Sequence, residues 1–161
     1  MTAELSSFLA AQDPKLLAWD PNLATDLFNA GQKYNVDPRL MASIVTLESG
    51  HGAVFGGTNN PFGLGPHLNF ATPQAAVKSE GVTLNHLISY GDTTVATLYS
   101  GLQRISNGHG GFTQVPGYCQ TSVAACQAAG TTVSGFLTSF AAVPNAALTA
   151  GNPNNLAFPC P

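Results

Sequence analysis

The stretch that decides the fold of this chain is Asp37-Pro38-Arg39-Leu40-Met41-Ala42-Ser43-Ile44-Val45-Thr46-Leu47-Glu48-Ser49-Gly50. Asp followed by Pro is typical of a helix start, because the Asp side chain accepts bonds from free backbone N–H groups and Pro suits the first helical position. Apolar residues then recur at helical spacing, at Met41, Ile44 and Val45. Gly50 is a typical C-terminal cap. The pattern predicts a buried helix in which Glu48 takes a place that the apolar stripe would otherwise fill.

Further helix signals lie on both sides of this stretch. Asp20-Pro21 predicts a helix that runs up to Asn35, and Thr72-Pro73 predicts a long one in which Gly81 allows a close approach. Three more helices are predicted: from Asp92 or Thr93 up to Asn107-Gly108, over about 122–129, and from Thr131 or Thr132 through Phe140.

The segments between these helices are rich in glycine and proline. Residues 50–65 and 107–118 are predicted to be loops, and the tail from Pro144 an extended segment on the surface. No stretch has the period of two that predicts a strand. We therefore expect one mainly α domain over 1–161, with its core at about 22–143 and an extended C-terminal tail at 144–161.

The charge content is low and excludes several classes of function. Only 8 % of the 161 residues are Asp, Glu, Lys or Arg, against roughly 25 % in an ordinary domain. Five Lys and Arg residues and a net charge of −3 argue against nucleic acid as a partner, since that binding needs clustered cations. No apolar run is long enough to cross a bilayer. We expect a soluble monomer, and the search for catalytic glutamates is confined to Glu4, Glu48 and Glu80.

The three cysteines bear on the compartment of the protein. Cys119 and Cys126 are seven positions apart, a spacing compatible with a disulfide, whereas Cys160 is left over in the tail. If the first two are oxidised, the protein works outside the cytoplasm. No cysteine or histidine cluster has the spacing of a metal site, so no metal and no cofactor are expected. The N-terminus carries no signal peptide, and we expect a secreted or periplasmic protein whose signal has been removed.

Glu48 is the sharpest candidate for chemistry. A carboxylate at the end of an apolar stripe, facing a glycine-rich loop, is partly desolvated, which raises its pKa. A carboxylic acid that stays neutral near pH 7 can protonate the leaving oxygen of a glycoside. The alternative is a glutamate that is simply solvated at the end of its helix.

The sequence around Glu48 resembles a known family. Residues 36–52, with Glu48-Ser49-Gly50-His51-Gly52, and the loop Asn59-Asn60-Pro61-Phe62-Gly63 resemble the lysozyme superfamily. They are most similar to the bacterial peptidoglycan endo-β-N-acetylglucosaminidases, of the mannosyl-glycoprotein endo-β-N-acetylglucosaminidase-like family. Residues 70–77 and Gly117-Tyr118 look like later segments of that family, so the resemblance covers roughly 22–140. It implies a lysozyme-like helical domain that cleaves β-1,4 bonds of peptidoglycan or a related N-acetylhexosamine polymer.

The resemblance also implies roles for single residues. Glu48 would protonate the glycosidic oxygen, and Tyr118 would be the tyrosine that faces it. Asn60, Phe62 and Gly63 would shape the sugar cleft. His51 and His67 flank the same loop, and their position makes them candidates for contact with the sugar, His51 above all. Two alternatives stay open, since Phe62 can be a core residue and Tyr118 can merely pack over the Cys119–Cys126 loop.

The chain departs from the family in its second carboxylate. Glycosidases commonly use two, roughly 5–5.5 Å or 6.5–9.5 Å apart. The family carries the second one on a β-hairpin after the Phe62-Gly63 loop, where this chain has only a short connection, so the β-lobe is expected to be reduced or absent. Glu80 is interpreted as a helix carboxylate with one solvated face, Asp92 as a helix cap and Tyr99 as a core residue.

If the cleft supplies only one carboxylate, two catalytic mechanisms are possible, and a non-catalytic function is the alternative. The substrate's acetamido group can attack the anomeric carbon, or the 6-hydroxyl of N-acetylmuramic acid can close on it, which is the chemistry of lytic transglycosylases. A β-N-acetylglucosaminidase is the first choice and a lytic transglycosylase the second. The alternative is a non-catalytic glycan-binding module at the cell surface that keeps the cleft without turnover.

Overall fold

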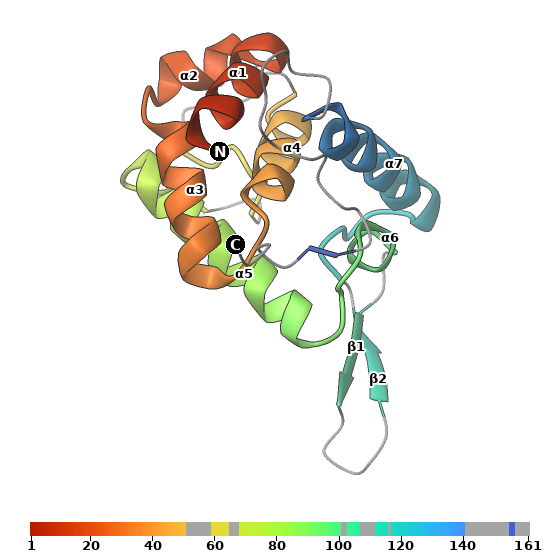
Figure 1. Ribbon diagram of the computed structural model, residues 1–161. Coiled ribbons are helices and arrows are strands. Elements are labelled where there is room, and N and C mark those ends of the chain that lie inside the picture. Colours follow the sequence, from red (N-terminus) through yellow and green to blue (C-terminus); the bar gives the residue numbers. More distant parts are fainter. Residues whose placement is uncertain are drawn as a thin grey trace.

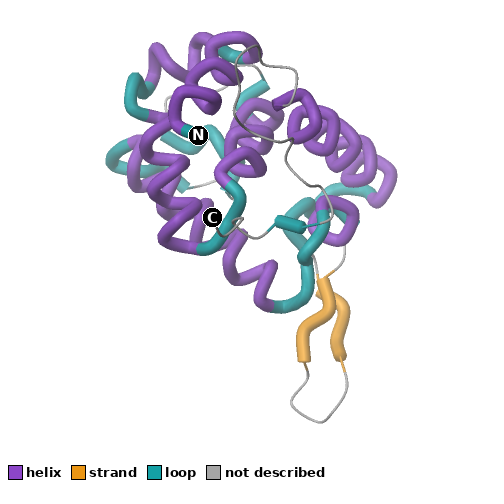
Figure 2. The backbone as a smooth tube through the Cα atoms, viewed as in Figure 1, coloured by secondary structure: helices purple, strands orange, loops and turns teal. Residues whose placement is uncertain are grey.

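The computed structural model describes residues 1–50, 59–64, 68–100, 117–140 and 155–156, together with the backbone of 103–106 and 112–115. It is mainly helical, as the sequence predicts (Figures 1 and 2). In chain order, the elements are α1 (Thr2–Gln12), α2 (Pro14–Trp19), α3 (Leu23–Tyr34), α4 (Pro38–Glu48), α5 (Pro73–Ser89), α6 (Val95–Leu98), β1 (Gln103–Ser106), β2 (Phe112–Val115) and α7 (Val123–Ser139).

Helix α4 is the central element of the fold, and every residue from Pro38 to Thr46 is buried. It packs against α1, α3 and α7 (Figure 1). Its start is capped as predicted, because the Asp37 carboxylate accepts a hydrogen bond of 2.9 Å from the Arg39 backbone N–H. Gly50 follows the helix with φ of 57°, the left-handed conformation that a terminal glycine favours.

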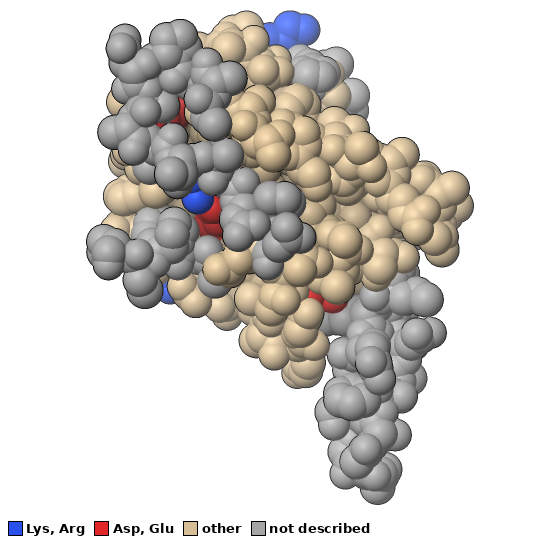
Figure 3. Space-filling view, turned by 45° about the vertical axis from the view of Figure 1, so that its right-hand side comes forward, with Lys and Arg blue, Asp and Glu red and all other residues tan. Residues whose placement is uncertain are grey.

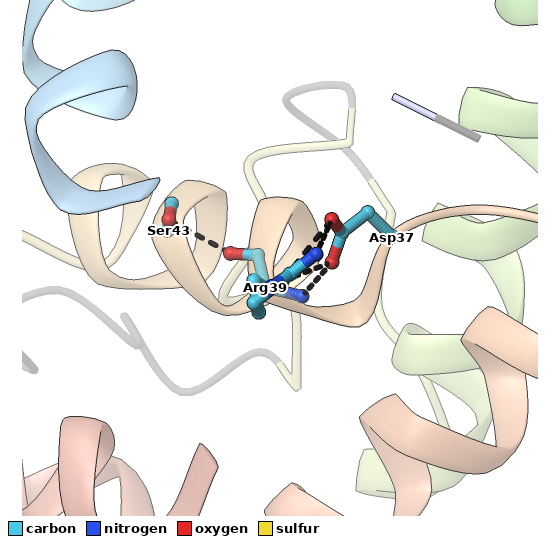
Figure 4. A network of polar contacts seen from close by, with 3 residues as sticks. All are labelled: Asp37, Arg39 and Ser43. Atoms are coloured by element: carbon cyan, nitrogen blue, oxygen red, sulfur yellow. Dashed lines mark hydrogen bonds and ion pairs between the residues drawn. The ribbon is translucent and has the colours of Figure 1, made fainter. Parts of the chain in front are cut away.

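A buried ion pair closes the first turn of α4. The Arg39 guanidinium binds the Asp37 carboxylate, with Nη2 2.6 Å from Oδ2, and both side chains are at most 5 % exposed. Ser43 continues the network by donating to the Arg39 carbonyl oxygen at 2.7 Å (Figure 4). Because both charges are buried together, removal of either partner would leave the other uncompensated.

The start of α3 differs from the prediction by two residues. Asn22 is the N-terminal cap and Leu23 begins the helix, whereas the sequence favoured Asp20 and Pro21. The reason is an element that the sequence analysis did not predict, because the backbone N–H of Asp20 closes α2 by bonding to the Leu16 carbonyl oxygen. The Asp20 carboxylate accepts instead from the Asn22 N–H at 3.0 Å.

The prediction of one helix from residue 92 or 93 to about 106 is wrong. Among the described residues of this stretch, Val95–Leu98 alone is helical, and its cap is Thr94, whose side chain pairs with Thr97 in a capping box. Asp92 is therefore not the cap. Its side chain is 7 % exposed, and burial raises the pKa of this carboxyl.

A β-hairpin is found instead, so the expectation of no strand is also wrong. Strand β1 lies in the second half of that predicted helix, and β2 lies in the stretch 107–118 that was predicted to be a loop. Strands β1 and β2 pair antiparallel, with Gln103 opposite Val115 and Ser106 opposite Phe112, and they project from the helical body (Figure 2). The physical reason is that Asn107-Gly108, interpreted as a helix stop, also fits the short glycine-containing loop of a hairpin, here the five residues between Ser106 and Phe112. Asn107 and Gly108 lie outside the described part of the chain.

Helix α7 replaces the two helices that were predicted on either side of Gly130. It runs without a break from Val123 to Ser139, capped by the Ser122 side chain. A Cβ atom at position 130 would lie 2.8 Å from the Cβ of Tyr99. The glycine therefore permits a close approach of α7 to the residue after α6, and it does not end a helix.

The core lies between α1, α3, α4, α5 and α7. The predicted close approach at Gly81 is confirmed, since a Cβ there would meet the Tyr34 ring at 2.5 Å. In the tail, Leu156 is buried, donates to the Thr93 carbonyl oxygen and accepts from the Asp37 N–H. At this one described point, the tail enters the core, which corrects its prediction as a surface segment. In the described part of the chain, no helix combines the length and apolar character that a membrane crossing requires.

Candidate functional site

A cleft of about 780 Å³ opens between the end of α4, the 62–64 loop, α5 and the segment that leads into α7. Most of its lining is apolar or carries an uncharged hydroxyl or amide group. The described surface as a whole is poor in charge, as the face in Figure 3 shows. The lining residues are Leu47, Glu48, Phe62, Gly63, Leu64, Leu68, Ser79, Thr83, Leu87, Gly117, Tyr118, Cys119, Gln120, Thr121, Ala125 and Ala129.

Glu48 is the last residue of α4 and the carboxylate among the lining residues of this cleft. Its side chain is exposed into the cleft, in contrast to the buried residues Met41, Ile44 and Val45 of the same stripe. Burial by the surrounding walls nevertheless raises the pKa of the Glu48 carboxyl, in the direction that the sequence predicts. Glu48 is thus both reachable from solvent and biased towards its neutral form.

Gly63 lies directly against this carboxyl group. Its φ is 65°, and a Cβ built on it would lie 3.2 Å from Oε2 of Glu48. Both facts favour glycine here, because a side chain would strain the backbone and press on the acid. Gly63 therefore lets the loop lie close to Glu48.

Asn60 shapes the loop and is not among the residues that line the cleft. Its Oδ1 accepts from the Leu64 N–H at 3.0 Å, and its carbonyl oxygen accepts from the Gly63 N–H at 3.3 Å. The neighbouring Asn59 ties the loop to the rest of the fold, by donating to the Phe70 carbonyl oxygen and accepting from the Trp19 indole. Asn60 thus acts on the cleft through the position of Gly63.

Phe62 fits both interpretations that the sequence left open, a core residue and a residue of the cleft. It is only 2 % exposed and belongs to the hydrophobic core, yet it also lines the cleft. Phe62 is therefore a core residue that also borders the cleft.

Tyr118 also lines the cleft and is hydrogen-bonded to a buried acid. Its hydroxyl donates to Oε1 of Glu80 at 2.9 Å. Its ring also meets Tyr99 edge-on, with centroids 5.5 Å apart. Burial raises the pKa of both phenols well above the ordinary value, so both stay protonated. Tyr99 is 1 % exposed, which confirms its prediction as a core residue.

Glu80 is the functional candidate that the sequence analysis missed. It was interpreted as having a solvated face, but its side chain is fully buried. Burial raises the pKa of Glu80 to about 8, the hydrogen bond from Tyr118 lowers it, and the charge of Glu48 raises it. The signal was present, because Glu80 follows the buried Ala76 and Val77 by four and three residues and so lies on the inward face of α5.

The segment after Tyr118 is closed by the pair predicted from the sequence. Cys119 and Cys126 are disulfide-bonded, with Cα atoms 5.6 Å apart, and Cys119 lines the cleft. The bond links the Tyr118 segment to the first turn of α7. Cys160 lies outside the described residues.

The end of α4 is held by a residue from the N-terminal helices. Ser49 donates from Oγ to Oδ2 of Asp13 at 3.0 Å, and both side chains are buried. The sequence analysis missed Asp13 because it predicted no element before residue 20. This contact fixes the residue directly after Glu48.

Of the four histidines, only His86 lies in the part of the chain that the structure describes. His51, His67 and His109 lie outside it, so the predicted contact of His51 with the sugar stays a prediction. His86 is exposed on α5, with its ring 4.5 Å from that of Tyr90. Within the described ranges, no three His, Cys, Asp or Glu side chains are grouped as a metal site would need.

In physical terms, the fold and the cleft define a mainly helical domain whose cleft holds a partly desolvated glutamic acid and a half-buried tyrosine that is bonded to a buried acid. Comparison of the chain with family models, with curated proteins and with solved structures found no match. The function proposed below therefore rests on the geometry of the cleft.

Proposed function

We propose that this protein is a glycoside hydrolase that cleaves β-1,4 bonds of peptidoglycan or a related N-acetylhexosamine polymer, with Glu48 as the general acid. The observation that carries the proposal is the position of Glu48, which is reachable in a cleft whose walls raise its pKa. A general acid needs this combination, since it must meet the leaving oxygen while it still holds a proton. The resemblance of residues 36–64 to the lysozyme superfamily gives independent support.

The lining of the cleft suits an uncharged sugar chain. Leu64 and Leu68 offer apolar surface for the faces of pyranose rings, and Ser79, Thr83 and Gln120 offer hydroxyl and amide groups for their edges. Such a mixture of apolar walls and a few polar groups is common in small-ligand sites. We assign the sugar polymer to this cleft on that ground.

Glu80 does not supply the second catalytic carboxylate of this proposal. It is fully buried and bonded to Tyr118, so it cannot reach the anomeric carbon of a sugar in the cleft. The two mechanisms that need one protein carboxylate remain. Attack by the acetamido group leaves a reducing N-acetylglucosamine end, and closure by the 6-hydroxyl leaves a 1,6-anhydromuramic end.

We also propose that the protein works outside the cytoplasm, as a secreted or periplasmic monomer. The Cys119–Cys126 bond supports this, because disulfides persist mainly in oxidising compartments. A cell-wall polymer is found in the same place, so the compartment and the substrate class agree.

The experiment is lysis of purified cell wall by the unchanged chain and by Glu48→Gln, followed as loss of turbidity and as clearing in a gel. Glu48→Gln keeps the shape of the side chain and cannot donate the proton of an acid, so its rate should fall by roughly 100-fold or more. Glu4→Gln is the matched control. Glu4 is the N-terminal glutamate, paired with the Met1 amino group, and it lies outside the cleft.

Two outcomes contradict the proposal. Equal lysis by Glu48→Gln and the unchanged chain would remove Glu48 from the chemistry. No lysis of any wall type or chito-oligosaccharide by the unchanged chain, together with retained binding, would favour the glycan-binding module instead.

A further inference from the structure

The bond between Tyr118 and Glu80 joins the wall of the cleft to the buried core. Tyr118 lines the cleft, and its hydroxyl donates to Oε1 of Glu80 at 2.9 Å. Glu80 is 0 % exposed, and its second oxygen, Oε2, has no hydrogen-bond partner within the described part of the chain. Tyr118 is thus the side chain to which this buried carboxyl group is anchored.

Burial and the charge of Glu48 favour a neutral Glu80 carboxyl, and the hydrogen bond from Tyr118 works against them. Tyr118 faces it from the segment before α7, and Glu48 and Tyr99 act on the same cluster from the end of α4 and from the residue after α6. On the side of α3, the ring of Tyr34 packs over the adjacent Gly81. These neighbours are phenols and a carboxylate, and none is a cation. A neutral Glu80 accepts the phenol's hydrogen bond without bringing a second negative charge near Glu48.

We propose that Glu80 is a positioning residue of the cleft, which fixes the hydroxyl of Tyr118 through this hydrogen bond and thereby sets where the phenol meets the sugar. The inference rests on the proposed function, because it assigns Glu80 to the same site. Glu80 acts from behind Tyr118 and does not itself touch the substrate.

Packing alone does not explain an acid at this position. Replacing a buried ionisable group by an apolar one of similar volume is often neutral or stabilising. The edge-on contact with Tyr99 holds the Tyr118 ring. The direction of the hydroxyl, however, needs a hydrogen-bond partner, and Glu80 is the acceptor that the structure provides.

The test compares kcat and KM for four variants: Glu80→Leu, Glu80→Gln, Tyr118→Phe and the double variant Glu80→Leu/Tyr118→Phe. Glu80→Leu removes the acceptor and should lower kcat by up to about 100-fold, the scale of a 1 Å misplacement. Glu80→Gln keeps an acceptor oxygen and should stay within about tenfold of the unchanged chain. The double variant should be no slower than Tyr118→Phe, because Glu80 acts through that hydroxyl.

Leu84→Ala is the control for damage to α5. Leu84 is buried in the same helix, one turn after Glu80, and is not among the lining residues of the cleft. It should lower stability and leave kcat unchanged at temperatures where the protein is folded. Equal kcat in Glu80→Leu and Glu80→Gln, or losses that add in the double variant, would overturn the proposal. If Glu80→Leu does not fold, the double variant, in which both polar partners are gone, replaces it.

A second readout does not depend on turnover. The chain has glutamates only at positions 4, 48 and 80, so carbon-13 labelling of glutamate carboxyls gives three signals to titrate. Tyr118→Phe removes the bond that lowers the pKa of Glu80, and the pKa should therefore rise. An unchanged Glu80 pKa in Tyr118→Phe would contradict the hydrogen bond. An inactive chain with the expected shift would instead reject the proposed function, so the two failures are distinguishable.

Discussion

At the scale of single residues, the two glutamates near the cleft have opposite surroundings and different roles. Glu48 is open to the cleft, and burial by the cleft walls raises the pKa of its carboxyl, whereas Glu80 is fully buried behind Tyr118. The sequence predicts Glu48, because its helix end and glycine loop are local features. Glu80 and Tyr118 are 38 residues apart in the chain. A local sequence pattern cannot predict which distant side chain will hydrogen-bond to a buried acid.

The buried Glu80 makes stability depend on pH. Its pKa is raised to about 8 when folded and is near 4.5 in an unfolded chain. Between these values the folded chain holds a proton that the unfolded chain has lost, so the free energy of unfolding falls as pH rises, by roughly 1.4 kcal/mol per pH unit at most. Below about pH 4.5 and above about pH 8, the contribution of Glu80 to the free energy of unfolding no longer changes with pH.

Glu80→Gln removes the titrating group, and its stability relative to the unchanged chain should therefore increase steadily from pH 5 to pH 8. Urea unfolding of both chains at several pH values measures the difference. Because the other acids are common to both chains, their titration cancels. A difference that does not change with pH would show that Glu80 is already ionised in the folded state.

At the scale of elements, helices with both ends marked in the sequence are predicted well. Helices α4 and α5 begin at the predicted Asp37-Pro38 and Thr72-Pro73. The predictions of secondary structure are wrong where the same residues are compatible with two different local structures. Asn107-Gly108 fits a helix stop or a hairpin loop, and Gly130 fits a helix break or a close contact. Tertiary packing decides between these structures, and a local pattern does not contain it.

Gly130→Ala tests the close contact in α7. Alanine is favoured over glycine in a helix by about 1 kcal/mol, yet its Cβ would lie 2.8 Å from the Cβ of Tyr99. We expect net destabilisation, since overpacking typically costs about 1–3 kcal/mol. Gly135→Ala is the matched control, because nothing lies within 4 Å of a Cβ there. Thermal unfolding should move down for the first variant and up for the second, and equal upward shifts would refute the contact.

At the scale of the whole molecule, the cleft is assembled from segments that are distant in the chain. The end of α4 is fixed by Asp13 through Ser49, the tyrosine wall by the Cys119–Cys126 bond, and the start of α4 by Leu156 of the tail. The sequence predicts the mainly helical class and the position of Glu48 at a helix end. It does not predict the contacts by which the N-terminal helices and the tail hold α4. These are long-range contacts, which only the folded chain brings together.

The central claim is that Glu48 donates the proton that breaks a glycosidic bond in this cleft. Mass spectrometry of the fragments released from purified peptidoglycan by the unchanged chain and by Glu48→Gln tests it most directly. The account predicts fragments that end in reducing N-acetylglucosamine, or in 1,6-anhydromuramic acid, from the unchanged chain and their near-complete loss in Glu48→Gln. The same fragments in equal yield from both proteins would contradict it.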